Sequence, residues 1–338
     1  MLRRFGYAGS LVLSASALAC LAAFFLSSCA PTYPRENLCE LVKTVCRAEY
    51  DMDVDASMDG STLGIYYPMK GLLDVSMGIS TDAWDKVSNL ILVASRVVLS
   101  TDANIKFYCV ITQDERLPEM QMIIIKYTDD VKKGMFRYIG RDESFKRTLF
   151  SINLTPQARK ERSIERIFDK MGLEEDTREN VMSEFFRSPP SDIKDIGYWK
   201  DHFYLKDISL EEFLIAQIAN RVKLDFQSDA KLKELFKFSS SEGKIIASKE
   251  EKVMVVAFKI FDQTTDTNHK DVLKRKVKAI VNIASTVVQG YAFDQFTALE
   301  MEDQLENVKL TVSSDDLYNY RDGKVPIESI VKASGEYF

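Results

Sequence analysis

Two histidines are the only imidazole groups in the 338-residue sequence, which limits the acid–base and metal chemistry open to it. His202 lies among the aromatic residues Trp199, Phe203 and Tyr204 on a predicted strand, and His269 precedes a predicted helix. Neither has a Gly-x-Ser-x-Gly partner, so a Ser-His-Asp triad is not indicated. No glycine-rich phosphate-binding loop is present. We therefore expect no catalytic residues and no cofactor.

Carboxylates alternate along residues 51–59, in an arrangement that could open a calcium-binding loop. Such a loop also needs glycine at its sixth position and glutamate at its twelfth, where this sequence has Ala56 and Thr62. The residues between the carboxylates are mostly apolar, which is typical of a half-buried strand with a solvent face. A second acidic stretch, at residues 262–271, is interpreted as a polar loop. We expect no metal at either place.

Three cysteines in the body of the chain could form a disulfide. Cys39 and Cys46 lie on one predicted helix, about 10 Å apart along its axis, which is too far for a bridge between them. We expect three buried thiols, because apolar residues stand at the matching places of a later repeat. A bridge from Cys109 to Cys46 or to Cys39 stays open as the alternative, provided that the compartment is oxidising.

The N-terminus carries the strongest chemical signal. Two arginines precede an apolar run over residues 11–26, which ends in Leu26-Ser27-Ser28-Cys29. This order is typical of a targeting segment. The tetrapeptide resembles the lipobox of bacterial lipoproteins, which implies a diacylglycerol on the Cys29 thiol, cleavage before this residue and acylation of the new amino group. A plain cleaved signal peptide and an uncleaved membrane anchor are the alternatives.

The lipoprotein resemblance implies a location in the bacterial cell envelope, with the chain facing the periplasm and held to the membrane through lipid on Cys29. Ala30 follows this cysteine, which favours the outer over the inner membrane by the sorting rule of enteric bacteria. Residues 29–35 form a short tether. Removing the signal peptide, residues 1–28, changes the net charge from −6 to −8. This charge disfavours nucleic acid and anionic lipid as partners, and leaves an envelope protein as the expected one.

Hydrophobic periodicity predicts one order of elements twice, α-β-β-α-β-β-α. In the long helices, residues 283–288 (IASTVV) mirror residues 93–98 (VASRVV), and the last helices open on residues 314–316 (SDD) and 128–130 (TDD). We therefore predict an α+β protein of two tandem modules. Each module should have a four-stranded, mostly antiparallel sheet with helices on one face. No motif in the repeats identifies a family.

The first predicted module occupies residues 36–145 and the second residues 209–338, with an insert at residues 146–208. Two strands, at residues 148–154 and 198–205, are expected to frame the insert. The insert therefore belongs to neither copy of the repeat.

Inside the insert, residues 156–171 and 177–186 predict a helical hairpin with apolar residues on one face. This face either packs on the body or makes the hairpin an arm that binds a partner. We predict a lipid-anchored, non-enzymatic envelope protein that binds or scaffolds a protein partner near the membrane. The alternative function is binding of a small ligand or glycan in the groove between the two modules.

Overall fold

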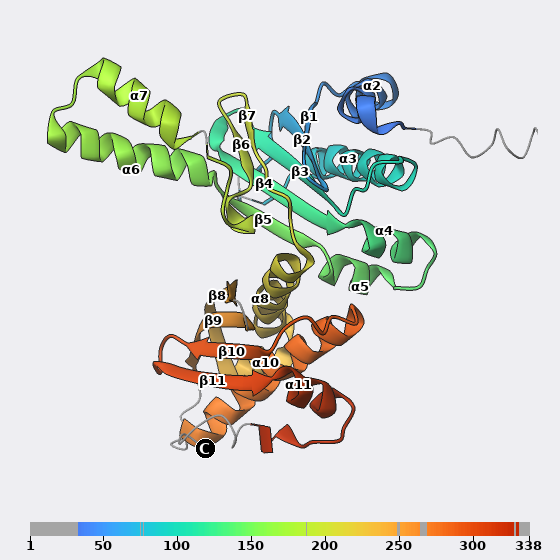
Figure 1. Cartoon of the computed structure of the whole chain (residues 1–338), viewed down its shortest axis with the longest axis vertical. Coiled ribbons are helices and arrows are strands. Elements are labelled where there is room, and N and C mark those ends of the chain that lie inside the picture. Colours follow the sequence, from blue (N-terminus) through green and yellow to red (C-terminus); the bar gives the residue numbers. More distant parts are fainter. Residues whose placement is uncertain are drawn as a thin grey trace, which may run out of the picture.

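The computed structural model describes residues 33–330 except 75, 77, 187, 249–250, 264–268 and 328. Two α+β modules follow one another along the long axis of the molecule (Figure 1). The first module has the predicted order α-β-β-α-β-β-α, and the second has the same order with one short additional helix after its first helix, so the predicted fold class is confirmed. No helix in the described part of the chain is both long enough and apolar enough to span a membrane.

The first module builds its sheet from two hairpins joined by a long helix. After a short turn, η1 (Arg35–Asn37), its elements are α2 (Leu38–Tyr50), β1 (Asp55–Asp59), β2 (Thr62–Met69), α3 (Thr81–Leu99), β3 (Phe107–Asp114), β4 (Leu117–Tyr127) and α4 (Thr128–Met135). The strands pair in the order β1-β2-β3-β4, and only the β2–β3 pair is parallel. The dipeptide Asp59-Gly60, which favours a tight hairpin turn, lies at the β1–β2 turn, where Gly60 has a positive φ of 56° that glycine adopts without strain.

The second module repeats this topology. Its elements are α8 (Leu210–Ser228), α9 (Ala230–Leu235), β8 (Phe236–Ala247), β9 (Lys252–Asp262), α10 (His269–Gly290), β10 (Ala298–Asp303), β11 (Val308–Ser313) and α11 (Ser314–Arg321). The strands pair in the order β8-β9-β10-β11, again with a parallel central pair. The mirrored sequence segments lie in α3 and α10 and at the starts of α4 and α11, so the sequence repeat and the structural repeat agree.

The insert departs from the expected layout in two ways. Its first strand, β5 (Leu149–Leu154), pairs with β4 and gives the first sheet five strands instead of four. The single strand expected at residues 198–205 is a hairpin, β6 (Gly197–Trp199) and β7 (His202–Tyr204). Lys200 and Asp201 form its turn with positive φ values of 49° and 61°, a conformation that their residue types do not signal. A short helix that the sequence did not predict, α5 (Arg141–Lys146), precedes β5.

The first sheet is buried on both faces, whereas we expected helices on one. Tyr108 and Val110 of β3 face the core under α2 and α3. The alternate residues Phe107, Cys109 and Ile111 face a second core that continues into the second module. The reason is that β6, β7 and α8 cover this face, so the two modules share this second core, whereas the core under α2 and α3 belongs to the first module.

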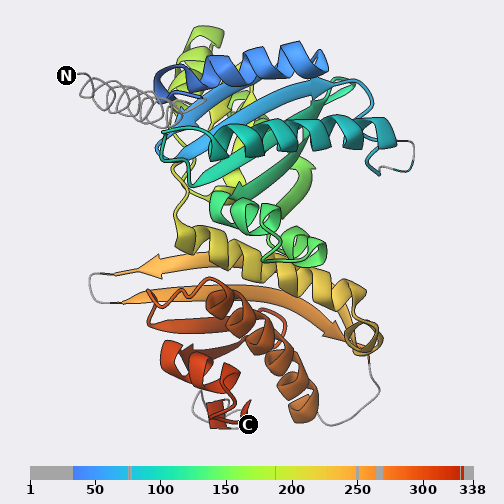
Figure 2. The ribbon, with the colours of Figure 1, turned by 90° about the vertical axis from the view of Figure 1, so that its right-hand side faces the viewer.

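Helix α8 lies between the two sheets (Figure 2) and is buried on nearly every side. A capping box fixes its start, where Ser209 Oγ accepts from the Glu212 backbone at 3.3 Å. Its backbone approaches β8 so closely that a Cβ at Gly243 would lie 2.5 Å from the Ile215 carbonyl oxygen. Because α8 packs against both modules, it buries residues on several sides of the helix, the polar Gln217 and the charged Arg221 included.

Candidate functional site

Two helices of the insert project from the edge of the first sheet, on the left of Figure 1. They are α6 (Pro156–Met171) and α7 (Glu175–Phe185), and we call residues 156–185 the arm. Gly172 ends α6 with a φ of 64°, as a glycine at this position commonly does. The predicted helical hairpin is therefore present.

Polar contacts fix the base of the arm to the body. Gln157 Nε2 donates to the carbonyl oxygen of Asp195 at 2.8 Å. The buried carboxylate of Glu161 accepts from Trp199 Nε1 at 2.7 Å and pairs with Lys200. A short turn, η2 (Ile193–Asp195), and the β6–β7 hairpin thus hold the first two turns of α6. The direction of the arm is set by this base.

The outer half of the arm exposes apolar side chains. Ile167 is 52% exposed and Met171 is 65% exposed, although both are large hydrophobic residues. Together with the half-buried Ile164 they lie at positions i, i+3 and i+7 of α6, which places them along one stripe. Phe168 is buried, and Arg178 of α7 donates to Asp169 at 2.8 Å, so the two helices are joined to each other. The stripe itself is open to solvent.

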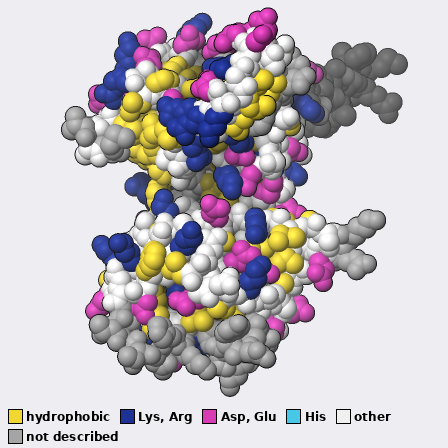
Figure 3. Space-filling model, turned by 90° about the vertical axis from the view of Figure 1, so that its left-hand side faces the viewer, with side chains coloured by type: hydrophobic (Ala, Val, Ile, Leu, Met, Phe, Trp, Pro, Cys, Tyr) yellow, Lys and Arg dark blue, Asp and Glu magenta, His cyan; other side chains and the backbone are white. Residues whose placement is uncertain are grey.

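The charges that border this stripe are mostly positive. Helix α6 has five cations and three carboxylates. Lys160, Arg162, Glu161 and Asp169 form ion pairs with residues outside α6. Among the described residues, the remaining charges of α6 are those of Arg159, Arg166, Lys170 and Glu165. Figure 3, seen from the side of the arm, shows Lys and Arg side chains beside hydrophobic ones on the upper module.

A cavity lies between the two modules, where the alternative function placed a ligand. Its volume is about 240 Å³. Ile123 and Ile125 of the first sheet form its apolar wall, and Ala219, Asn220 and Lys223 of α8 lie opposite. The cavity is smaller than the roughly 300–1,000 Å³ that is usual for small-molecule sites. It is therefore the weaker of the two candidate sites.

The residues that would carry the lipid lie outside the described residues. These are Leu26, Ser27, Ser28 and Cys29. The described chain begins at Tyr33, whose backbone N–H donates to the Ser100 carbonyl at 3.2 Å. The end of the tether is thus fixed to the first module four residues after Cys29.

The carboxylates of residues 51–59 that could have opened a calcium-binding loop contact different partners. Asp53 pairs with Arg47 at 2.5 Å, and Asp55 accepts from the Tyr198 hydroxyl at 2.8 Å. His202 is exposed on β7, whereas residues 264–268 and the side chain of His269 lie outside the described part. In the part that is described, no three His, Cys, Asp or Glu side chains are gathered to hold a metal.

The three body cysteines are free thiols. Cys46 faces the core under α2, whereas Cys109 lies on the opposite face of β3. Cys39 belongs to the same helix as Cys46, so the sheet separates both from Cys109 and the alternative disulfides are wrong. Burial raises the pKa of the Cys46 thiol to about 11 and that of Cys109 further, which makes both unreactive at neutral pH.

A second exposed apolar group was missed by the sequence reasoning. It lies between α4 and α5, where Met135, Phe136 and Tyr138 are among the most exposed large hydrophobic residues of the described chain. The available signal was the sequence KKGMFRYIGR at residues 132–141, which has four cations and no carboxylate. The sequence analysis did not predict that the apolar residues of this cation-rich segment would be exposed side by side.

No protein-family model matches the sequence, and no match was found among the curated proteins or the solved structures. Functional conclusions therefore rest on the residues of this chain.

Proposed function

We propose that the protein is a lipid-anchored, non-enzymatic component of a bacterial cell envelope that binds a partner protein through the arm. The observation that carries the proposal is the exposed stripe of Ile164, Ile167 and Met171 on a helix whose base is fixed to the body. A rigid base lowers the entropy lost on binding, and an exposed apolar stripe supplies the free energy gained when water is excluded.

The stripe also specifies the partner. Anchors at positions i, i+3 and i+7 fit a hydrophobic groove that receives one face of a helix. The cations Arg159, Arg166 and Lys170 exceed the one remaining carboxylate, Glu165, so an acidic rim would match them. The proposed partner therefore has an apolar groove with an acidic rim.

The anchor and the arm fit one arrangement. The coloured ribbon of Figure 1 begins on the right, beside α2, whereas the arm projects on the left. If Cys29 carries lipid, the tether side faces the membrane and the arm extends away from it. The resemblance to lipoproteins and the identity of Ala30 support the periplasmic face of the outer membrane as the location.

Site-specific cross-linking tests the arm. A photoreactive amino acid at position 167 should form one protein adduct in native membranes, and Met171→Asp should abolish it by placing a charge in the groove. Ile246 of β8 is the matched control, because it is 50% exposed and lies in the second module. The probe at position 246 should give no such adduct, and Ile246→Asp should leave the adduct at 167 intact. Equal labelling from both positions, or none from 167, would refute the proposal.

Binding of a small ligand or glycan in the cavity between the modules is the second candidate. It is supported by the position of the cavity at a module boundary, and by an apolar wall with Asn220 and Lys223 opposite. Ala219→Phe would fill the cavity. A sugar or small organic anion that raises the melting temperature of the native chain, but not of this variant, would favour this function. If the variant responds equally, the ligand binds elsewhere.

A further inference from the structure

The connection between α4 and α5 combines exposed aromatic rings with cations. We call residues 132–141 the α4–α5 loop. Phe136 is 71% exposed and Tyr138 is 79% exposed. Lys132, Lys133, Arg137 and Arg141 are its four cations, and it contains no carboxylate.

An ordered backbone presents these side chains. The Phe136 N–H donates to the Lys132 carbonyl at 3.0 Å, and the Tyr138 N–H donates to the Lys133 carbonyl at 2.8 Å. Between them Arg137 has a positive φ of 59°, at a position after a helix where glycine is usual. The rings of Phe136 and Tyr138, which flank Arg137 in the sequence, have their centroids 6.2 Å apart, so the two exposed rings lie close together.

The α4–α5 loop lies on the same side of the molecule as the tether. Tyr33 is bound to Ser100 at the end of α3, and the Thr128 N–H at the start of α4 donates to the Lys106 carbonyl at 2.8 Å, just before β3. The segment between α3 and β3 therefore contacts both the end of the tether, at Tyr33, and the start of α4, at Thr128. In Figure 1 the ribbon begins on the right and the α4–α5 connection extends to the right; in Figure 2, which faces this side, α4 and α5 lie in front.

The tether leaves little freedom. Tyr33 is four positions after Cys29, and a fully extended chain covers at most about 3.6 Å per position, or roughly 14 Å in all. A lipid on Cys29 would thus hold this side of the first module against the membrane surface. Whatever the module exposes here must meet either lipid or a neighbour in the membrane.

We propose that the α4–α5 loop binds the anionic phospholipid surface of the membrane in which the lipid of Cys29 is inserted. Aromatic rings with a polar edge, such as that of Tyr138, favour the interface, and cations favour anionic head groups. The net charge of −8 argues against lipid binding for the whole chain, but screening limits each charge to about 10 Å. Of the carboxylates that flank the loop in sequence, Asp129 is paired with Lys132, and Asp130 and Glu143 are paired with Arg147. Asp142 is then the remaining flanking carboxylate against Lys133, Arg137 and Arg141, which leaves a local excess of cations. The inference rests on the proposed lipid anchor.

Tryptophan quenching tests this contact in the full, lipid-modified chain. Tyr138→Trp and the control Ile246→Trp are reconstituted into vesicles of phosphatidylethanolamine and phosphatidylglycerol with brominated acyl chains. Emission from Trp84 and Trp199 is subtracted by means of the unmodified chain. We expect quenching of the tryptophan at position 138 and none at position 246.

Charge is tested separately. Arg137→Gln and Arg141→Gln, introduced into Tyr138→Trp, should weaken the docked state about fivefold for each cation removed. Replacing phosphatidylglycerol by phosphatidylcholine should reduce quenching in the same direction. Glutamine at position 137 is uncharged but polar, so it can stay at the surface. Circular dichroism should therefore show that the Arg137→Gln variant remains folded.

The outcomes separate the loop from the anchor. A chain that is recovered with the vesicles but shows no quenching at position 138 overturns the inference and leaves the anchor intact. Undiminished quenching in phosphatidylcholine overturns the role of anionic lipid. A protein adduct from position 138 in native membranes, without quenching in vesicles, shows a protein neighbour instead. Failure of the mature chain to bind vesicles at all overturns both the anchor and the inference.

Discussion

The guanidinium of Arg147, which lies just before the fifth strand of the first sheet, is 4.7 Å from the centre of the Tyr291 ring in the second module. Arg147 also donates to Asp130 at 2.8 Å, and the Tyr291 hydroxyl donates to the same carboxylate. Burial, together with the neighbouring Asp130, raises the pKa of Tyr291 well above its ordinary value, so the hydroxyl stays a donor. The two modules are thus joined by a buried charged group as well as by apolar packing.

Arg147→Met should lower the free energy of unfolding by about 3–5 kcal/mol, because Asp130 would remain buried without its ion pair. Adding Asp130→Asn should restore much of this loss. The measurement is urea unfolding followed by circular dichroism. Lys132→Met is the control, since Lys132 pairs with the exposed Asp129 at 3.1 Å and such pairs contribute at most about 1 kcal/mol. Equal effects of the two single substitutions would contradict the prediction.

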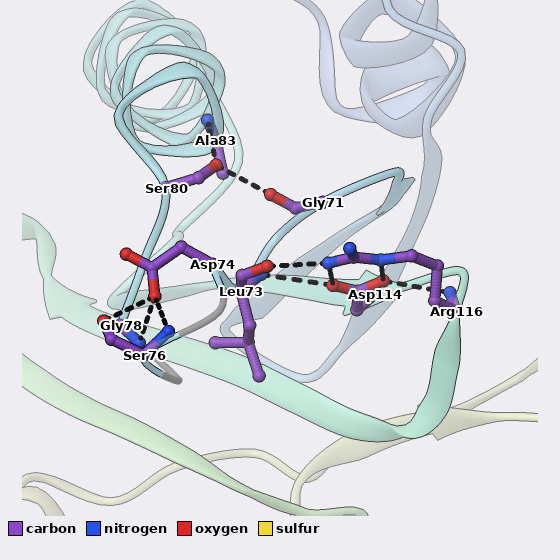
Figure 4. A network of polar contacts seen from close by, with 9 residues as sticks. All are labelled: Gly71, Leu73, Asp74, Ser76, Gly78, Ser80, Ala83, Asp114 and Arg116. Carbon is purple, nitrogen blue, oxygen red and sulfur yellow. Dashed lines mark hydrogen bonds and ion pairs between the residues drawn. The ribbon is translucent and has the colours of Figure 1, made fainter.

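Asp114 should make stability depend on pH (Figure 4). Its buried carboxylate accepts from Arg116 Nη2 at 2.8 Å and from the Leu73 N–H at 3.1 Å. The hydrogen bonds from the Arg116 side chain are the main cause of a pKa well below the usual range for Asp114. The stabilisation is therefore complete above the ordinary pKa of about 4 and is lost as the pH falls towards the folded value.

Asp114→Asn should accordingly cost about 1–3 kcal/mol at pH 7, since the donors lose a charged acceptor. The difference from the unmodified chain should shrink below about pH 4. Urea unfolding at several pH values measures it. Arg116→Gln should show the same trend, and a difference that stays constant down to pH 3 would argue against this account.

Thiol labelling should show that the three cysteines of the body are free thiols and not part of a disulfide. Mass spectrometry of the non-reduced, folded body should find free thiols at Cys39, Cys46 and Cys109. A water-soluble alkylating agent should reach Cys46 and Cys109 only after unfolding, because both are fully buried. Rapid labelling of either in the native chain, or a linked peptide that contains Cys109, would disprove the arrangement of the two cores.

Cys29→Ser should abolish lipid attachment, because the thiol is the acceptor in the lipobox reaction. The precursor should then keep residues 1–28 and fail to incorporate labelled fatty acid. Cys20→Ser, within the apolar run, is the matched control and should be processed normally. Normal processing of Cys29→Ser would rule out the proposed anchor.

A flexible insert between Ala30 and Pro31 should weaken contact between the α4–α5 loop and lipid. The lipid would still be attached, but the effective concentration of the surface near the loop falls as the tether lengthens. Quenching of the tryptophan in Tyr138→Trp is the readout, with inserts of increasing length. Unchanged quenching with a thirty-residue Gly/Ser insert would show that the loop binds independently of the tether.

The repeat could be predicted because its signals are local. Ser80 and Ser209 cap their helices, and the apolar residues that indicate β3 and β9 are buried in the structure, on both faces of each strand. Strand β8 was harder, because the sequence pattern predicts a strand only over residues 244–248, whereas β8 already begins at Phe236. Its polar first half contains a bulge between Phe238 and Ser240, which interrupts the alternation on which the prediction depended.

The candidate site shows the limit of local signals. The helices of the arm followed from periodicity, but the direction of α6 depends on Glu161 reaching Trp199 across 38 residues. Likewise, the cover over the second face of the first sheet comes from α8, more than 80 residues after β4. Contacts of this range are set by the packing of whole elements, and a window of sequence does not contain them.

The position of α8 has a consequence for synthesis and export. The first sheet is complete in the chain at Leu154, yet Phe107, Cys109 and Ile111 stay uncovered until α8, which ends at Ser228, has been made and, if the chain is exported as proposed, has crossed the membrane. An emerging first module would therefore expose a broad apolar surface on a sheet, the kind of surface that promotes aggregation. If it is exported to the periplasm as proposed, this chain should depend on a chaperone there until its second half arrives.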